Sequence, residues 1–97
     1  MMSRLLNLVS TQSPILESVG ISVTATHHIP DHGGYVDLET TDVIARITLQ
    51  DSGLCDVELI DIASETTLQW AHHQVTDVEG LERILKDLQT KMLEETH

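Results

Sequence analysis

Histidine is the residue type in this sequence whose number and spacing suggest a chemical role, the binding of a metal ion. The 97 residues contain six, including the adjacent pairs His27 and His28, and His72 and His73. Zinc needs several ligands that converge on one point. Adjacent residues on a strand point to opposite faces of a sheet, so each pair offers at most one ligand per face. The single cysteine, Cys55, has no Cys-x-x-Cys companion. The sequence therefore predicts no metal site and no cofactor.

The residue types used in nucleophilic and acid–base catalysis are present, but no motif arranges them as catalysis requires. The sequence contains no Gly-x-Ser-x-Gly elbow, and Gly33 with Gly34 precedes a strand pattern and lacks the Gly-x-Gly-x-x-Gly frame. Asp56 and Glu58 form a pair of acids, but a small sheet without a cleft gives them no burial to assign separate acid and base roles. We predict that the chain is not an enzyme. The alternative, a small enzyme, requires a concave polar pocket.

Net charge limits the partners. Sixteen Asp and Glu against five Lys and Arg give a formal charge of -11. Such a field repels nucleic acid and anionic membranes, because a phosphate backbone binds clustered Lys and Arg. It attracts a cationic protein and accelerates the encounter. The simpler alternative is that the acidic surface only keeps the protein soluble.

The sequence also predicts one cytoplasmic domain over residues 1–97. One cysteine forms no internal disulfide, no stretch approaches the roughly 18 apolar residues of a membrane span, and no signal peptide is recognised. With no Phe, one Trp and one Tyr, the core must consist of Val, Ile and Leu. Trp70, as the only large aromatic residue, is expected in the layer between sheet and helices.

Both ends of the chain have helical patterns. Apolar residues recur at helical spacing over 3–19, where Pro14 either starts a second short helix or kinks a single one, and Gly20 is a natural stop. Near the other end, Thr76 and Glu79 have the spacing of a capping box. The apolar stripe of the second helix consists of Val78, Leu81, Leu85, Leu88 and Met92.

The middle of the chain alternates apolar and polar residues, as half-buried strands do. This alternation predicts strands over residues 21–26, 35–39, 43–49, 54–62 and 67–73. Short connections, such as Asp-Ser-Gly at 51–53, favour an antiparallel meander. We predict an α+β, two-layer fold, in which an antiparallel sheet of four to five strands has the N-terminal and C-terminal helices packed on one face.

Acidic residues concentrate in these strands. Nine lie between positions 31 and 65, where Arg46 is the only basic residue. In the strands over 35–39 and 54–62 the acids alternate with apolar residues, which directs them to the solvent face. Like charges on one sheet face repel, and Arg46 is placed to relieve part of that repulsion. A surface built for a basic partner explains this crowding.

A resemblance rests on the central block. It comprises Tyr35-Val36-Asp37, residues 45–49 (Ala-Arg-Ile-Thr-Leu), residues 51–53, Asp61-Ile62 and Leu68. With a Leu-rich opening helix and a closing helix, this block resembles the small immunity proteins of bacterial polymorphic toxin systems, in particular the TriTu family. The resemblance implies a non-enzymatic protein that neutralises an ADP-ribosyltransferase toxin. The resemblance further implies that the toxin modifies elongation factor Tu and is delivered by type VI secretion.

An immunity protein of this kind is expected to act as a monomer in a one-to-one complex that occludes the toxin domain. Steering by the acidic surface would precede the desolvation of a few anchor residues. The residues predicted to contact the toxin are Asp37, Glu39, Asp56, Glu58 and Asp61. The alternative is an acidic secretion chaperone or adaptor that binds an extended effector segment, for example by adding a strand to a sheet edge.

Overall fold

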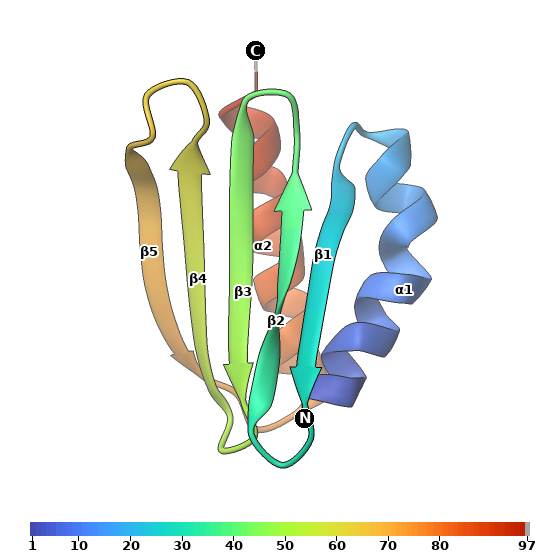
Figure 1. Ribbon diagram of the computed structural model, residues 1–97. Coiled ribbons are helices and arrows are strands. Elements are labelled where there is room, and N and C mark those ends of the chain that lie inside the picture. The colour runs from blue at the N-terminus through green and yellow to red at the C-terminus, as the bar shows by residue number, and fades with distance from the viewer. Residues whose placement is uncertain (97) are drawn as a thin grey trace.

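The computed structural model describes residues 1–96 and has two layers (Figure 1). The elements are α1 (Met2–Ser18), β1 (Ser22–Ile29), β2 (Gly33–Glu39), β3 (Val43–Gln50), β4 (Leu54–Asp61), β5 (Thr67–Gln74) and α2 (Val78–Glu94). All neighbouring strands pair antiparallel, and the sheet order β1-β2-β3-β4-β5 follows the chain. Both helices lie on one side of the sheet, with α2 behind β3 and α1 beside β1. The predicted α+β meander is confirmed.

The core between the layers is aliphatic. On β3 every second residue is buried, and the same period holds on β4, so one sheet face meets the apolar stripes of the helices. Within residues 1–96, no aromatic side chain belongs to the core. Its largest fully buried members include Met2, Leu5, Leu16, Ile21, Leu38, Ile47, Leu49, Leu59, Leu81, Leu88 and Met92. Each such leucine contributes about 1.5–3 kcal/mol by burial.

The first helix is continuous. Pro14 lies inside α1, so the single-helix alternative holds and no second helix begins there. Gly20 ends the helix with a φ of 87°, and its N–H donates to the Glu17 carbonyl at 3.1 Å. The Ile21 N–H donates to the Leu16 carbonyl at 2.9 Å. These two bonds form a Schellman motif, which explains the stop at glycine.

The cap of the second helix lies one residue later than the capping-box spacing suggested. Asp77 is the N-cap, in an extended conformation, and its Oδ1 accepts a hydrogen bond from the Gly80 N–H at 2.8 Å. The assignment of Thr76 as the cap was therefore wrong. Only one residue can hold that position, and a carboxylate both accepts the bond and interacts favourably with the positive helix N-terminus.

Trp70 does not lie in the core, which corrects the expectation from sequence. The residue is 66% exposed, the highest fraction among the exposed large hydrophobic residues. On β4, Val57 and Leu59 face the helices, and they pair with Ala71 and Gln69. Trp70 lies between those two positions, so alternation turns it to the other face. The strand is at the sheet edge, where neither helix in Figure 1 covers it.

Candidate partner-binding face of the sheet

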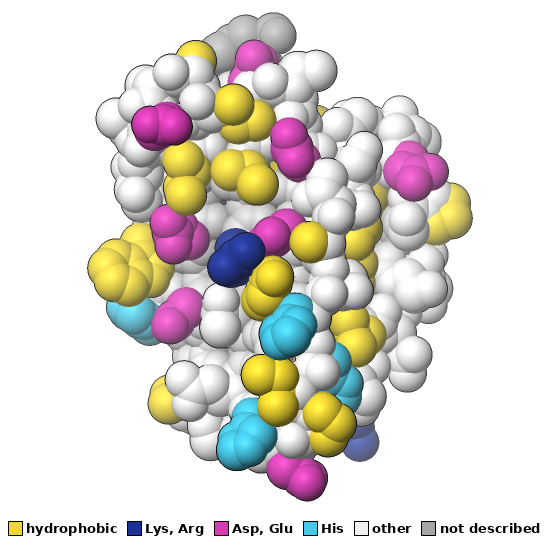
Figure 2. Space-filling model, in the orientation of Figure 1, with side chains coloured by type: hydrophobic (Ala, Val, Ile, Leu, Met, Phe, Trp, Pro, Cys, Tyr) yellow, Lys and Arg dark blue, Asp and Glu magenta, His cyan; other side chains and the backbone are white. Residues whose placement is uncertain are grey.

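The sheet face opposite the two helices carries the candidate site, and we call it the open face. Strand pairing arranges its central side chains in rows that cross the sheet. The first row is Ala25, Asp37, Arg46, Glu58 and Trp70; the second is His27, Tyr35, Thr48, Asp56 and His72; the third contains Glu39, Ile44 and Ile60. Figure 2 shows acidic and hydrophobic side chains gathered on this face, with histidines toward the lower end in that view.

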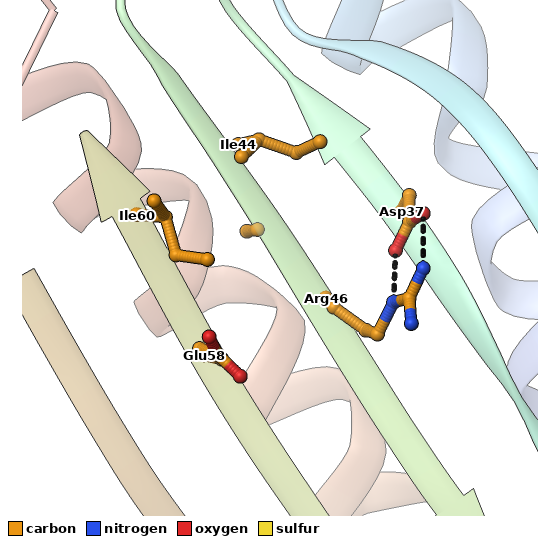
Figure 3. Close-up of a pocket in the computed structure, with 6 residues that line it drawn as sticks. Asp37, Ile44, Arg46, Glu58 and Ile60 are labelled. Atoms are coloured by element: carbon orange, nitrogen blue, oxygen red, sulfur yellow. Dashed lines mark hydrogen bonds and ion pairs between the residues drawn. The ribbon is translucent and has the colours of Figure 1, made fainter. Parts of the chain in front are cut away.

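Arg46 and Asp37 form a bidentate ion pair at the centre of the first row (Figure 3). The Arg46 Nε donates to Asp37 Oδ1 at 2.8 Å, and Nη2 donates to Oδ2 at 3.0 Å. The Asp37 side chain is only 11% exposed, against 50% for Arg46. The guanidinium also lies over the Tyr35 ring, 3.8 Å from its centroid. The pair therefore fixes Arg46 toward β2 by a planar fork and a cation–π contact.

The same pair determines the electrostatics at the centre of the open face. The hydrogen bond to Asp37 raises the pKa of Arg46, with Coulomb attraction from Asp37, Tyr35 and Glu58 adding to it, while partial burial acts in the opposite direction. Arg46 is thus a permanent cation that is already committed to Asp37. In Figure 3 its side chain extends away from Glu58, which leaves the Glu58 carboxylate on the β4 side of the row.

A small hollow lies beside this ion pair. It has a volume of about 170 Å³ and is lined by Asp37, Ile44, Ala45, Arg46, Glu58 and Ile60 (Figure 3). Ile44 and Ile60 are cross-strand partners and are both half-buried, so the hollow has an apolar end and a charged end. Pockets for small ligands are roughly 300–1,000 Å³. This hollow is better matched to one protein side chain than to a metabolite.

Imidazoles occupy both edges of the second row. His72 Nδ1 bonds to Asp56 Oδ1, and the Trp70 ring lies 5.1 Å from the His72 ring between centroids. At the opposite edge, the His27 and Tyr35 rings are 5.4 Å apart. Within the described part of the chain, no three His, Cys, Asp or Glu side chains come together to hold a metal ion.

The structure brings together four of the five predicted contact residues. Glu39, Asp56 and Glu58 are half-buried on the open face, and Asp37 lies there too but is buried by its pairing with Arg46. Asp61 is separate. It ends β4 at a position of opposite parity, and its Oδ2 accepts bonds from the Ser64 N–H at 3.0 Å and the Ser64 hydroxyl at 2.6 Å. Whether these residues contact a partner stays a prediction.

Sequence reasoning missed the hydrophobic part of the open face. Ile60 shares the parity of Asp56 and Glu58, and Ile44 shares that of Arg46, so alternation alone could have placed both isoleucines there. Cys55 has the other parity and is buried. Burial, with a smaller contribution from Asp56, raises the pKa of the Cys55 thiol to about 11. A thiol of this kind is not an activated nucleophile.

Comparison with known proteins gives one finding. A family model described as "Immunity protein TriTu" matches residues 3–91, which span almost all of α1, the whole sheet and most of α2. No curated protein and no solved structure shows a significant match. Within residues 1–96, neither helix combines the length and apolarity that crossing a bilayer requires.

Proposed function

The chain belongs to the TriTu family of immunity proteins, and from this membership we propose that it neutralises one cognate toxin by covering it with the acidic open face. The observation that carries the proposal is the family match over residues 3–91. The toxin expected for this family is an ADP-ribosyltransferase that acts on elongation factor Tu after type VI delivery. Neutralisation would then occur in the cytoplasm, in a one-to-one complex and without catalysis by the immunity protein.

The open face supports this mode of action because neither helix of the chain covers it. Glu39, Asp56 and Glu58 place carboxylates across β2 and β4, and the hydrogen bonds of Arg46 go to Asp37. Complementary charge accelerates the encounter with a basic protein and orients it. Five strands about 4.8 Å apart and about eight residues long give a face of roughly 20 by 26 Å. One side of a standard interface buries about 800 Å², more than the roughly 520 Å² of this flat projection, so the toxin would cover the whole face.

A growth-rescue experiment tests the proposal. The toxin domain encoded beside this protein is induced in a susceptible bacterium with and without the full chain, and survivors are counted. The wild-type chain should restore growth. The double charge reversal Asp56→Lys with Glu58→Lys should lose most of the rescue, because it replaces attraction with repulsion on the open face.

The matched control reverses two acids on the opposite layer. Glu82→Lys with Asp87→Lys makes the same change in net charge on exposed positions of α2. This variant should rescue as well as wild type. Equal loss in both double variants would show that net charge matters and the open face does not. Failure of the folded, abundant wild-type chain to rescue would refute immunity against that toxin.

One observation favours a second candidate, a secretion chaperone or adaptor. The strand β5 is at the sheet edge, and its sequence from Thr67 to Gln74 contains no proline and no Asp, Glu, Lys or Arg. Such an edge can accept an extended strand from a client. Binding of an unfolded effector segment, without affinity for the folded toxin domain, would support the chaperone over the immunity protein.

A further inference from the structure

The two aromatic residues of this chain are both on the open face. The core contains neither of them, and the Tyr35 ring makes a cation–π contact with Arg46. Trp70 has no comparable structural role, because the residue is two-thirds exposed to water. Four of the exposed large hydrophobic residues lie along β4 and β5 or directly after β4: Leu54, Ile62, Leu68 and Trp70. Half of the eight exposed large hydrophobic residues in the described part of the chain therefore lie on the β4–β5 side of the sheet, spread along the length of these strands.

Carboxylates border the tryptophan. Glu58 is its cross-strand partner in the first row, and His72, whose ring contacts it, is bonded to Asp56. These contacts limit the orientations of the indole while leaving its outer surface exposed. Interface hot spots are enriched in tryptophan, and the rim around an interface core is polar.

We propose that Trp70 is the anchor residue of the toxin interface. This proposal rests on the proposed function. The matching site on the toxin is then an apolar pocket edged by Lys or Arg. The indole would fill the pocket, and Glu58 and Asp56 would meet the cations at its edge. Burial of Trp70 supplies affinity that the acidic rim alone does not, since rim charges mainly affect the rate of association.

Charge argues against a second copy of this chain as the occupant. Each copy has a formal charge of -11, and a symmetric dimer formed around Trp70 would bring two sets of Asp56 and Glu58 together. Juxtaposed like charges oppose such an association. A basic partner removes this repulsion.

Calorimetric titration of the toxin domain with full-length variants tests the anchor. Trp70→Ala should weaken affinity by roughly 30-fold or more, which corresponds to the hot-spot threshold of about 2 kcal/mol at 1.4 kcal/mol per tenfold. The matched control is Ile15→Ala, which truncates another exposed hydrophobic residue, 54% exposed, on α1. The control should stay within about threefold of wild type, because α1 lies on the other layer.

A second measurement does not depend on a substitution. The chain has one tryptophan, so incorporation of 5-fluorotryptophan gives a single ¹⁹F resonance. Addition of unlabelled toxin should shift this resonance and protect it from broadening by a soluble paramagnetic relaxation agent. If Trp70→Ala binds within threefold of wild type and the resonance stays unchanged at saturation, the anchor is refuted although immunity stands. If the wild-type chain neither binds the toxin domain nor protects the bacterium from it, the proposed function fails as well.

Discussion

The ion pair between Arg46 and Asp37 should stabilise the fold as well as shape the open face. Arg46→Met keeps much of the aliphatic stem but leaves the nearly buried Asp37 carboxylate without its two donors at 2.8 and 3.0 Å. Coulomb's law gives a ceiling of about 6 kcal/mol at 2.8 Å for an effective dielectric constant near 20. Because Arg46 is half exposed, solvent screening reduces this strongly. Hydrogen bonds to charged groups contribute about 1.5–3 kcal/mol net, so we expect a loss of about 2 kcal/mol.

A double-mutant cycle measures this quantity. Urea unfolding of wild type, Arg46→Met, Asp37→Asn and the double variant should give a coupling free energy near 2 kcal/mol. For a domain of this size, the single substitution of Arg46 should lower Tm by about 8–16 °C. Circular dichroism is the appropriate probe, because Trp70 is exposed in the folded state already. A coupling below about 0.5 kcal/mol would place the pair among ordinary surface salt bridges and refute the reasoning.

Two further predictions concern the helix cap and the buried thiol. Asp77→Ala should cost about 1 kcal/mol in urea unfolding, whereas Thr76→Ala should cost much less, since Asp77 alone accepts the Gly80 N–H bond; equal costs would contradict the cap assignment. The pKa of Cys55 is raised from 9.0 to about 11, so the unfolded chain releases its proton at lower pH and stability should fall between about pH 9 and 11 by up to 2–3 kcal/mol. In Cys55→Ala, the unfolding free energy should fall less steeply with pH across this range than in wild type. An equally steep fall in both proteins would refute the role of the Cys55 thiol.

Regular alternation made the central sheet predictable. On β3, Val43, Ala45, Ile47 and Leu49 alternate strictly with the residues of the other face, and all four are buried. Such a pattern fixes both the strand and its orientation, because a shift of one residue would expose the whole apolar set. The antiparallel order followed from the short connections.

The edges of the sheet were less predictable. β1 extends from Ser22 to Ile29 and so includes two histidines that the apolar pattern did not mark as strand. Register shifts between Val23 and Ala25 on β1 and between Leu59 and Ile60 on β4 displace the pairing of both edge strands. A bulge of this kind follows from tertiary packing and has no clear signal in a single sequence.

The position of Trp70 shows why hydrophobicity alone misassigned β5. Leu68 and Trp70 are the most apolar residues of that strand, so pattern reading places them toward the core. In the structure the inward positions of β5 belong to Gln69 and Ala71. An edge strand without a helix over it needs little apolar surface on its inner face, and its hydrophobic side chains become available for other contacts.

Much of the candidate site, by contrast, was implicit in the turns. Once the connection between β2 and β3 is centred between Thr41 and Asp42, antiparallel pairing must place Asp37 opposite Arg46 and Tyr35 opposite Thr48. The turn between β3 and β4 then places Glu58 opposite Arg46. The rows of the open face therefore follow from turn positions, whereas the bidentate geometry depends on rotamers that a sequence does not specify.

Because stability and partner binding are expected on opposite faces of the sheet, substitutions on the open face can alter specificity with little effect on the fold. Stability is concentrated on the helix-facing side, where the aliphatic core lies, while Glu58, Asp56 and Trp70 face solvent. Substitutions at exposed positions usually alter stability by less than about 0.5 kcal/mol, so Trp70 can be replaced to suit a different partner without unfolding the domain. The acids Asp56 and Glu58 are half-buried but lie outside the aliphatic core. Asp37 with Arg46 is the exception, because it contributes to both properties. We therefore expect altered toxin specificity to arise at Trp70 and the β4 acids before it arises at this ion pair.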